Sequence, residues 1–329
     1  MRQFWQGKHT LVTGGAGLIG HALVEELLRR GALVRATVFK ERAIELRHPR
    51  LEIVRCDLMQ PDACASVVQD QQIVIHAAAY IRGVKGRDAQ PNDIVMNNLV
   101  PSINVIDASC RAGVERVGWI GSSTVYPDRD HPLREEEAFL DDPLEPYAGI
   151  GWVKRYCEKL CMHYHRVTRT KFAMIRSAAV YGAHERFTKE DGHVLPALIM
   201  KAVERLDPFP VWGDGEDLRD FVYVDDLVEG LLLTIERHAE ADPINIATGS
   251  GFRIKDAVRL IIEHEGYRPR VVFQTDQPSV KKTRRLDVSK AKRLLGFEAR
   301  TPFADGLAKT IEWYRSTLVK QEPELSPLK

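Results

Sequence analysis

The segment PYAGIGWVKRYCEKL, residues 146–160, places a phenol, an ammonium and a carboxylate in one amphipathic helix pattern. A tyrosine four residues before a lysine shares a helical face with it, and the ammonium lowers the phenol pKa so that the pair can transfer a proton. Here the position four residues before Lys154 holds Ile150, and the position four residues after Tyr147 holds a glycine. The sequence therefore predicts either an enzyme without this acid or one that has moved it.

Tyr147 can still be the acid if the chain between it and Lys154 departs from a regular helix. Seven residues of regular helix would separate the two by about 10 Å, against about 6 Å for the usual spacing. Gly149 and Gly151 disfavour a helix interior, so a loop or bulge over 148–151 would fold the phenol back over a cofactor. The alternatives are a site with no equivalent tyrosine and a protein that binds a cofactor without catalysis.

A second chemical signal is the glycine-rich stretch TLVTGGAGLIG, which contains Gly14, Gly17 and Gly20. It follows an apolar strand pattern and opens an amphipathic helix whose first turn holds Leu18 and Ile19. Glycines at such a turn let the backbone approach a pyrophosphate, and the helix N-terminus supplies amide donors and positive potential. We expect this turn to bind a dinucleotide.

The second strand pattern ends without the acidic residue that binds the ribose hydroxyls of NAD. It reaches Val38 and Phe39 and then the cations Lys40 and Arg42. A cationic pair there favours the 2′-phosphate of NADP, with NAD as the alternative cofactor and a solvated charged loop as the alternative role. Asp57, after the third strand pattern, is a candidate for the adenine amino group.

Apolar strand patterns alternate with helical patterns through the first half of the chain, which predicts an α/β fold with a Rossmann-like, doubly wound parallel sheet. The rhythm stops after Gly182 and returns near residue 219. We therefore expect a dinucleotide-binding domain, a smaller and discontinuous C-terminal substrate domain, and a tail. Their expected ranges are 1–182 with 219–247, 183–218 with 248–320, and 321–329.

Composition limits the partners of this 329-residue chain. A net charge of +1 gives no basic field for nucleic acid, and no stretch has the roughly 18 apolar residues of a membrane span. No apolar run precedes the first strand pattern, so we expect a cytoplasmic protein. Five cysteines without paired ligand spacing argue against a disulfide framework and a zinc site.

With these residues in view, the chain resembles the extended short-chain dehydrogenase/reductase family, in particular its nucleotide-sugar epimerases, dehydratases and reductases. The resemblance rests on VTGGAGLIG, HAAA, GSSTVYP, VYG, VWGDGEDLRDFVYVDDLVEGL, NIATGSG and RRLDVSKAKRLLGF, which together span nearly the whole chain. GSSTVYP, GHVLPALIMK and VWGDGEDLRDFVYVDD are most similar to the GDP-fucose synthase branch, which acts on GDP-4-keto-6-deoxymannose.

The resemblance implies roles at several positions near the expected reaction centre. Ser122 matches the residue that orients the reacting oxygen. Lys154 matches the lysine of the proton-transfer pair, which also binds the cofactor through its nicotinamide ribose, and the tyrosine position of that pair is Ile150. Thr124 stands where that branch has a cysteine base, and His193 matches its general-acid histidine. A threonine hydroxyl is too weak an acid to act as a thiolate does, which counts against double epimerisation.

The resemblance also implies binding residues. Arg219 and Arg284 match cations that reach the nucleotide diphosphate, for which a guanidinium fork is suited, although a surface arginine is the plain alternative. Further substrate contacts are expected from Tyr80, Lys201 and Trp212, and further cofactor contacts from Leu58, Ala77 and Ala78.

Together these features favour an NAD(P)-dependent oxidoreductase that acts at C4 of a nucleotide-activated hexose and reduces a 4-keto-6-deoxy intermediate. One alternative is an epimerase or dehydratase with tightly held NAD. Another is a non-catalytic NADP-binding sensor. The helices of INVIDASCRAG and GWVKRYCEKLCMHYH resemble those of a family dimer bundle, so we expect a homodimer.

Overall fold

The computed structural model describes residues 2–40, 43–81, 91–188, 193–277 and 284–321. In this part of the chain, seven strands form a sheet in which every pair is parallel. In spatial order they are β11 (Ile244–Ile246), β6 (Lys171–Ser177), β5 (Arg116–Ser122), β4 (Ile73–His76), β1 (His9–Thr13), β2 (Leu33–Val38) and β3 (Leu51–Arg55). The predicted Rossmann-like sheet is confirmed.

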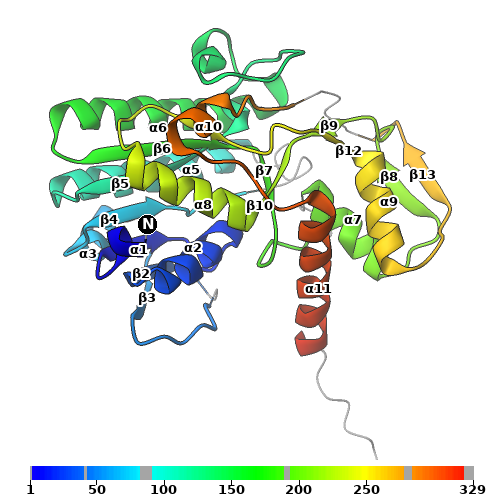
Figure 1. Cartoon of the computed structure of the whole chain (residues 1–329), viewed down its shortest axis with the longest axis horizontal. Coiled ribbons are helices and arrows are strands. Elements are labelled where there is room, and N and C mark those ends of the chain that lie inside the picture. The colour runs from blue at the N-terminus through cyan, green and yellow to red at the C-terminus, as the bar shows by residue number, and fades with distance from the viewer. Residues whose placement is uncertain (1, 41–42, 82–90, 189–192, 278–283, 322–329) are drawn as a thin grey trace, which may run out of the picture.

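Helices cover both faces of this sheet (Figure 1). One layer contains α3 (Pro61–Val68), α5 (Pro91–Arg111) and α6 (Ala148–Val167), and the other contains α2 (Leu18–Arg29), α8 (Val224–Arg237) and α10 (Ser289–Leu295), with the short α1 (Arg2–Trp5) beside it. Alternate strand residues feed the two layers, since Leu11 packs in one apolar cluster and Val12 in the other. Strand order reverses between β1 and β4, and ligands of such sheets bind at the carboxyl ends of strands at this point.

A smaller lobe lies to one side of the sheet (Figure 1). Its helices are α7 (Val194–Val203), α9 (Ile254–Glu265) and α11 (Phe303–Gln321). Its strands pair two by two: β8 (Phe209–Trp212) with β13 (Val271–Gln274), and β9 (Leu218–Arg219) with β12 (Phe252–Arg253). A further pair, β7 (Ala179–Tyr181) with β10 (Phe221–Tyr223), lies where the chain passes between the lobes.

The expected division into domains stays a prediction, and one helix of the expected substrate-domain range 248–320 contacts the sheet. Helix α10 packs against α8 and β11 on the sheet side. Lys290 and Asp242 form an ion pair at 2.6 Å, and Arg237 donates to the carbonyl of Leu295 at 2.5 Å, which attach this helix to the larger lobe. No helix in the described residues is both long and apolar enough to cross a membrane.

A buried ion pair fixes α6 on the sheet. Arg176 of β6 donates from Nε and Nη2 to the two carboxylate oxygens of Glu158 at 3.0 and 2.7 Å, and both side chains are almost fully buried. Arg176 also donates to the Tyr126 hydroxyl at 3.1 Å and to the Glu135 carbonyl at 2.6 Å. Because these groups belong to different segments, one guanidinium joins α6, β6 and the chain that follows β5.

We expect Arg176→Met to destabilise the fold by about 3–5 kcal/mol, because it leaves the Glu158 carboxylate buried without its cation. Urea unfolding gives the free energy. Arg29→Met is the matched control, since the Arg29–Glu26 pair lies at the surface and should contribute at most about 1 kcal/mol. Equal losses of unfolding free energy in the two variants would show that the buried pair stabilises the fold no more than the surface pair does.

Candidate functional site

The geometry of the turn between β1 and α2 requires a glycine at its first position, Gly14. Gly14 has a φ of 69°, and a Cβ there would lie 2.6 Å from the Cα of Ala78. Its amide donates to the Thr37 hydroxyl at 3.2 Å, while the Ala78 amide donates to the Thr13 hydroxyl at 3.2 Å. The ends of β1, β2 and β4 are thereby held together, with Ala77 and Ala78 beside the turn.

At position 17, neither the backbone conformation nor a close contact within the protein requires a glycine. The φ of Gly17 is −93°, and a Cβ there would find its nearest neighbour, the Gly14 carbonyl oxygen, at an ordinary 3.4 Å. Gly17 is the N-cap of α2, so the first-turn amides of Leu18 and Ile19 have no partner within the helix. A glycine that the fold itself does not require, beside open amide donors, fits a pyrophosphate that must approach the backbone closely.

The expected adenosine end is only partly described. Lys40 is exposed, has a φ of 55°, and its carbonyl accepts a hydrogen bond from Arg55. Arg42 lies outside the described residues. Asp57 follows β3, and its Oδ1 accepts the Met59 amide at 3.0 Å.

Leu58 and Tyr80 have local structural roles. Leu58 is buried, and its carbonyl accepts from Asn104 Nδ2 at 3.0 Å. Tyr80 is bracketed by the buried Asn98, whose side chain accepts from the Tyr80 amide at 3.0 Å and donates to its carbonyl at 2.9 Å. The Asn98 amide thus fixes the chain that follows β4.

At the end of β5, two hydroxyls lie close to the expected reaction centre. Ser122 Oγ accepts the Thr124 amide at 3.2 Å. The Thr124 hydroxyl is buried and has no hydrogen-bond partner among the described residues. Since an unsatisfied buried hydroxyl costs about 1–3 kcal/mol, this group is suited to a ligand that supplies the missing bond.

Lys154 lies against the same strand. Its Nζ donates to the Ile120 carbonyl at 2.9 Å and is 4.7 Å from the centre of the Trp119 ring. Burial lowers the pKa of Lys154. Burial, together with the Lys154 charge, also lowers the pKa of His76 to about 3. His76 is therefore a neutral linker, with Nδ1 2.9 Å from the Thr13 hydroxyl.

The helix that carries Lys154 is regular where a departure was expected. Helix α6 begins at Ala148 and runs unbroken, while Tyr147 closes the short 3-10 turn η3 (Glu145–Tyr147). The predicted loop or bulge over 148–151 is wrong. Gly151 is a glycine for another reason, because a Cβ there would lie 2.6 Å from the Thr124 carbonyl oxygen.

Tyr147 is instead directed toward Arg284, whose guanidinium carbon lies 4.7 Å from the centre of the Tyr147 ring. Ile150 takes the position four residues before Lys154 and packs at the edge of the apolar cluster under α5 and α6. The Tyr147 ring therefore lies beside Arg284, while the aliphatic side chain of Ile150 takes the position four residues before Lys154.

The two predicted diphosphate cations meet. Arg219 and Arg284 are partners in a β-bridge and line one small hollow. Arg219 lies 3.5 Å from Asp217, and Arg284 Nη2 donates to the Tyr126 carbonyl at 3.4 Å. The other residues of the hollow are Pro127, Asp128, Arg129, Leu133 and Leu144.

Three expected residues lie in the smaller lobe. His193 is the N-cap of α7, with its Nδ1 4.0 Å from a carboxylate oxygen of Glu185, and burial raises the pKa of Glu185 to about 7. Lys201 Nζ donates to the Pro210 carbonyl at 2.8 Å, and burial lowers its pKa. Trp212 ends β8 and is 38% exposed. One of the three N–H donors of the Lys201 ammonium thus holds the start of β8.

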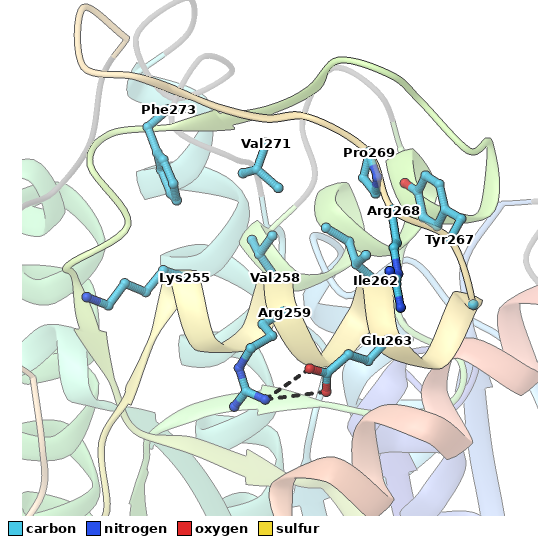
Figure 2. A pocket seen from close by; sticks show the side chains of 11 residues that line it. Lys255, Val258, Arg259, Ile262, Glu263, Tyr267, Arg268, Pro269, Val271 and Phe273 are labelled. Carbon is cyan, nitrogen blue, oxygen red and sulfur yellow. Dashed lines mark hydrogen bonds and ion pairs between the residues drawn. The ribbon is translucent and has the colours of Figure 1, made fainter.

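A larger cavity, of about 660 Å³, is lined by none of the expected site residues (Figure 2). It lies between α9 and β13. Lys255 and Arg259 on its rim are already paired with Glu216 and Glu263, at 2.5 and 3.1 Å. Both cations of this cavity therefore have a carboxylate partner, whereas Arg284 has none among the described residues.

Asp220 is a site residue that the sequence analysis missed. Its carboxylate accepts from the amide and hydroxyl of Thr248, from the Gly249 amide and from the Leu286 amide, at 2.6 to 3.4 Å. Its own amide donates to the Arg284 carbonyl at 3.2 Å. Asp220 therefore fixes the segment of Arg284 against that of Arg219. The only signal in the sequence is an acidic residue between Arg219 and an apolar run.

The model of the NAD dependent epimerase/dehydratase family matches residues 10–247, which include the glycine turn, Ser122, Lys154 and Arg219. The chain belongs to this family. The matched range covers most of the chain and includes the seven-stranded sheet of the described residues except His9, the first residue of β1.

Individual relatives agree with this assignment. GDP-L-fucose synthase of Sinorhizobium fredii is 31% identical over 318 residues, which cover 95% of this chain and 97% of the relative. MoeE5 in complex with UDP-glucose and NAD has 31% identity and a TM-score of 0.80, with 94% and 99% of the two chains covered. UDP-glucose 4-epimerase of Thermotoga maritima has 26% identity and a TM-score of 0.84, with coverage of 94% and 99%.

The regular geometry of α6 predicts what a phenol at position 150 would do. Ile150→Tyr places it one turn before Lys154, where the ammonium should lower its pKa by about 1–3 units from the ordinary value near 10. Ultraviolet difference titration against Ile150→Phe, which has the same ring without the hydroxyl, isolates this phenol. Titration at or above a pKa of 10 would show that Lys154 does not face position 150.

Proposed function

We propose that the protein is an NADP-dependent oxidoreductase that reduces C4 of a nucleotide-activated 4-keto-6-deoxy hexose. The observation that carries the proposal is the arrangement along α6. Lys154, which donates to the carbonyl of Ile120 near the end of β5, lies seven residues after Tyr147, which contacts Arg284. Seven residues of helix span about 10 Å, which leaves room for one sugar ring between a reacting carbon and a diphosphate.

The cofactor, when bound, supplies the hydride, and the protein supplies position and protons. Ser122 orients the C4 oxygen, and Lys154 holds a positive charge beside it that stabilises developing negative charge. The proton comes from Ser122, from His193 or from water. Reduction removes no hydrogen from carbon, so the threonine at position 124 is no obstacle, whereas epimerisation at carbon needs a base.

The binding residues are assigned accordingly. Gly14, Gly17, Leu18 and Ile19 receive the pyrophosphate, and Lys40 with Arg42 receives the 2′-phosphate. Asp57, Leu58, Ala77 and Ala78 complete the cofactor site. Arg219 and Arg284 bind the substrate diphosphate, with Thr124, Tyr80, Lys201 and Trp212 on the sugar and nucleotide side. The relative GDP-L-fucose synthase supports a GDP-sugar substrate.

A second enzyme reading has tightly held NAD and an epimerase reaction, as in the similar UDP-glucose 4-epimerase. A third, from another class, is a sensor that binds NADP without catalysis. We also propose a homodimer. Helices α5 and α6 pack side by side and leave Met96, Trp152 and Tyr156 about half exposed, which is a larger apolar surface than a solvated helix pair needs.

NADPH mixed with GDP-4-keto-6-deoxymannose tests the reductase reading against the other two. Reduction predicts loss of the reduced-nicotinamide absorbance in proportion to the sugar added, whereas the epimerase and sensor readings predict no net oxidation. UDP-4-keto-6-deoxyglucose tests the nucleotide preference. Lys154→Met is the control variant and should lose about 100-fold or more in rate. No NADPH oxidation with either sugar would remove the reductase reading.

Lys40 and Arg42 should select NADP. Replacing both with serine should weaken NADP binding about 10-fold or more and leave NAD binding nearly unchanged, because only NADP carries the 2′-phosphate. Fluorescence titration of NADPH and NADH measures both affinities. The control is Lys8→Ser, whose cation pairs with Glu115 at 2.9 Å away from the turn after β2. Equal losses for the two cofactors would count against the assignment.

A further inference from the structure

Arg284 is a half-buried cation without a carboxylate partner among the described residues, although Asp128 lines the same hollow. No carboxylate of the described residues lies within ion-pair distance of its guanidinium, which is bounded by the Tyr126 carbonyl, the Tyr147 ring and the neighbouring Arg219. Burial lowers the pKa of Arg284 to about 10, contact with Tyr147 opposes this shift, and the Arg219 charge adds to it. The guanidinium remains charged at neutral pH. A buried charge without a counter-ion is costly unless a ligand supplies one.

The two cations of the hollow are held in different ways. Arg219 has the Asp217 carboxylate at 3.5 Å, while Arg284 has the face of a tyrosine at 4.7 Å. An aromatic face attracts a cation through its quadrupole and carries no net charge. A carboxylate in the same place would compete with an incoming anion for the guanidinium. The ring therefore positions Arg284 and leaves its charge available.

The backbone holds Tyr147 in this role. It closes the 3-10 turn η3, its amide donates to the Leu144 carbonyl at 2.8 Å, and α6 begins at the next residue. Leu144 itself lines the hollow with Arg219 and Arg284. The chain just before α6 therefore contributes Leu144 to the hollow and holds the Tyr147 ring against Arg284.

We propose that Tyr147 is a positioning residue of the substrate-diphosphate site, where its ring presents Arg284 to the diphosphate without neutralising it. This inference rests on the proposed function. Tyr147 of PYAGIGWVK would then contribute to substrate affinity and not to proton transfer.

Calorimetric titration with GDP and with UDP tests the inference without the reaction. Tyr147→Leu removes the ring and should weaken the preferred nucleotide about 5–10-fold. Tyr147→Phe keeps the ring and should stay within about threefold of the wild type. Tyr147→Glu should bind more weakly than Tyr147→Gln, because only the carboxylate neutralises Arg284. NADPH affinity should be unchanged in all four variants.

A double-mutant comparison shows whether Tyr147 acts through Arg284. In an Arg284→Ala background, Tyr147→Leu should cause no further loss of nucleotide affinity, whereas in an Arg219→Ala background it should still cause one. A general structural defect would weaken binding in both backgrounds and would lower NADPH affinity as well.

The outcomes separate this inference from the proposed function. Wild-type protein that binds neither GDP nor UDP would overturn both. Wild-type binding that Tyr147→Leu leaves intact would overturn the inference alone. The same holds if Tyr147→Leu weakens binding equally with and without Arg284. A loss of about 100-fold in turnover for Tyr147→Phe with unchanged nucleotide affinity would return Tyr147 to the role of an acid.

Discussion

The ion pair between Glu158 and Arg176 determines where the groups of the site can lie. Both side chains are almost fully buried, so the orientation of α6 on β6 is fixed by a contact that cannot be relaxed by solvent. Lys154 precedes Glu158 by one turn, and its ammonium reaches the Ile120 carbonyl because the helix crosses the sheet at this place. The Lys154 charge near the end of β5 is therefore positioned by a pair to which the proposed reaction assigns no part.

The parts of the fold that depend on local rules could be predicted from the sequence. Alternating apolar strand and helix patterns predicted the sheet, and the glycine pattern predicted the turn at Gly14. In the structure, a positive φ and the contact with Ala78 require this glycine. The loop or bulge predicted from the glycines of α6 was wrong for a physical reason. A helical glycine costs only about 1 kcal/mol, which packing readily offsets. Gly151 is required by the approach of the Thr124 carbonyl, a tertiary contact that no local pattern contains.

The candidate site shows the same division. Arg219 and Arg284 were expected to act together because of their motifs, and the β-bridge between them places both at one hollow. Asp220 could not be recognised, since its role consists of hydrogen bonds to residues 248, 249 and 286, far along the chain. The position of Tyr147 also depends on such a contact, because the return of the chain at Arg284 supplies the cation that its ring contacts.

The absence of a phenol next to Lys154 weakens the case for catalysis less than it first suggests. One positioned general acid contributes about 10²–10⁴-fold, while enzymes accelerate their reactions by about 10⁶-fold or more. The larger share comes from orientation and from fixed charges, and in the proposed reduction these come from Ser122, Lys154 and the diphosphate cations. A binding protein has no need for a buried Thr124 hydroxyl without a hydrogen-bond partner among the described residues, or for a lysine whose pKa is lowered by burial. Because such groups cost stability, their persistence favours an enzyme that reacts without this tyrosine over a sensor that has lost its reaction.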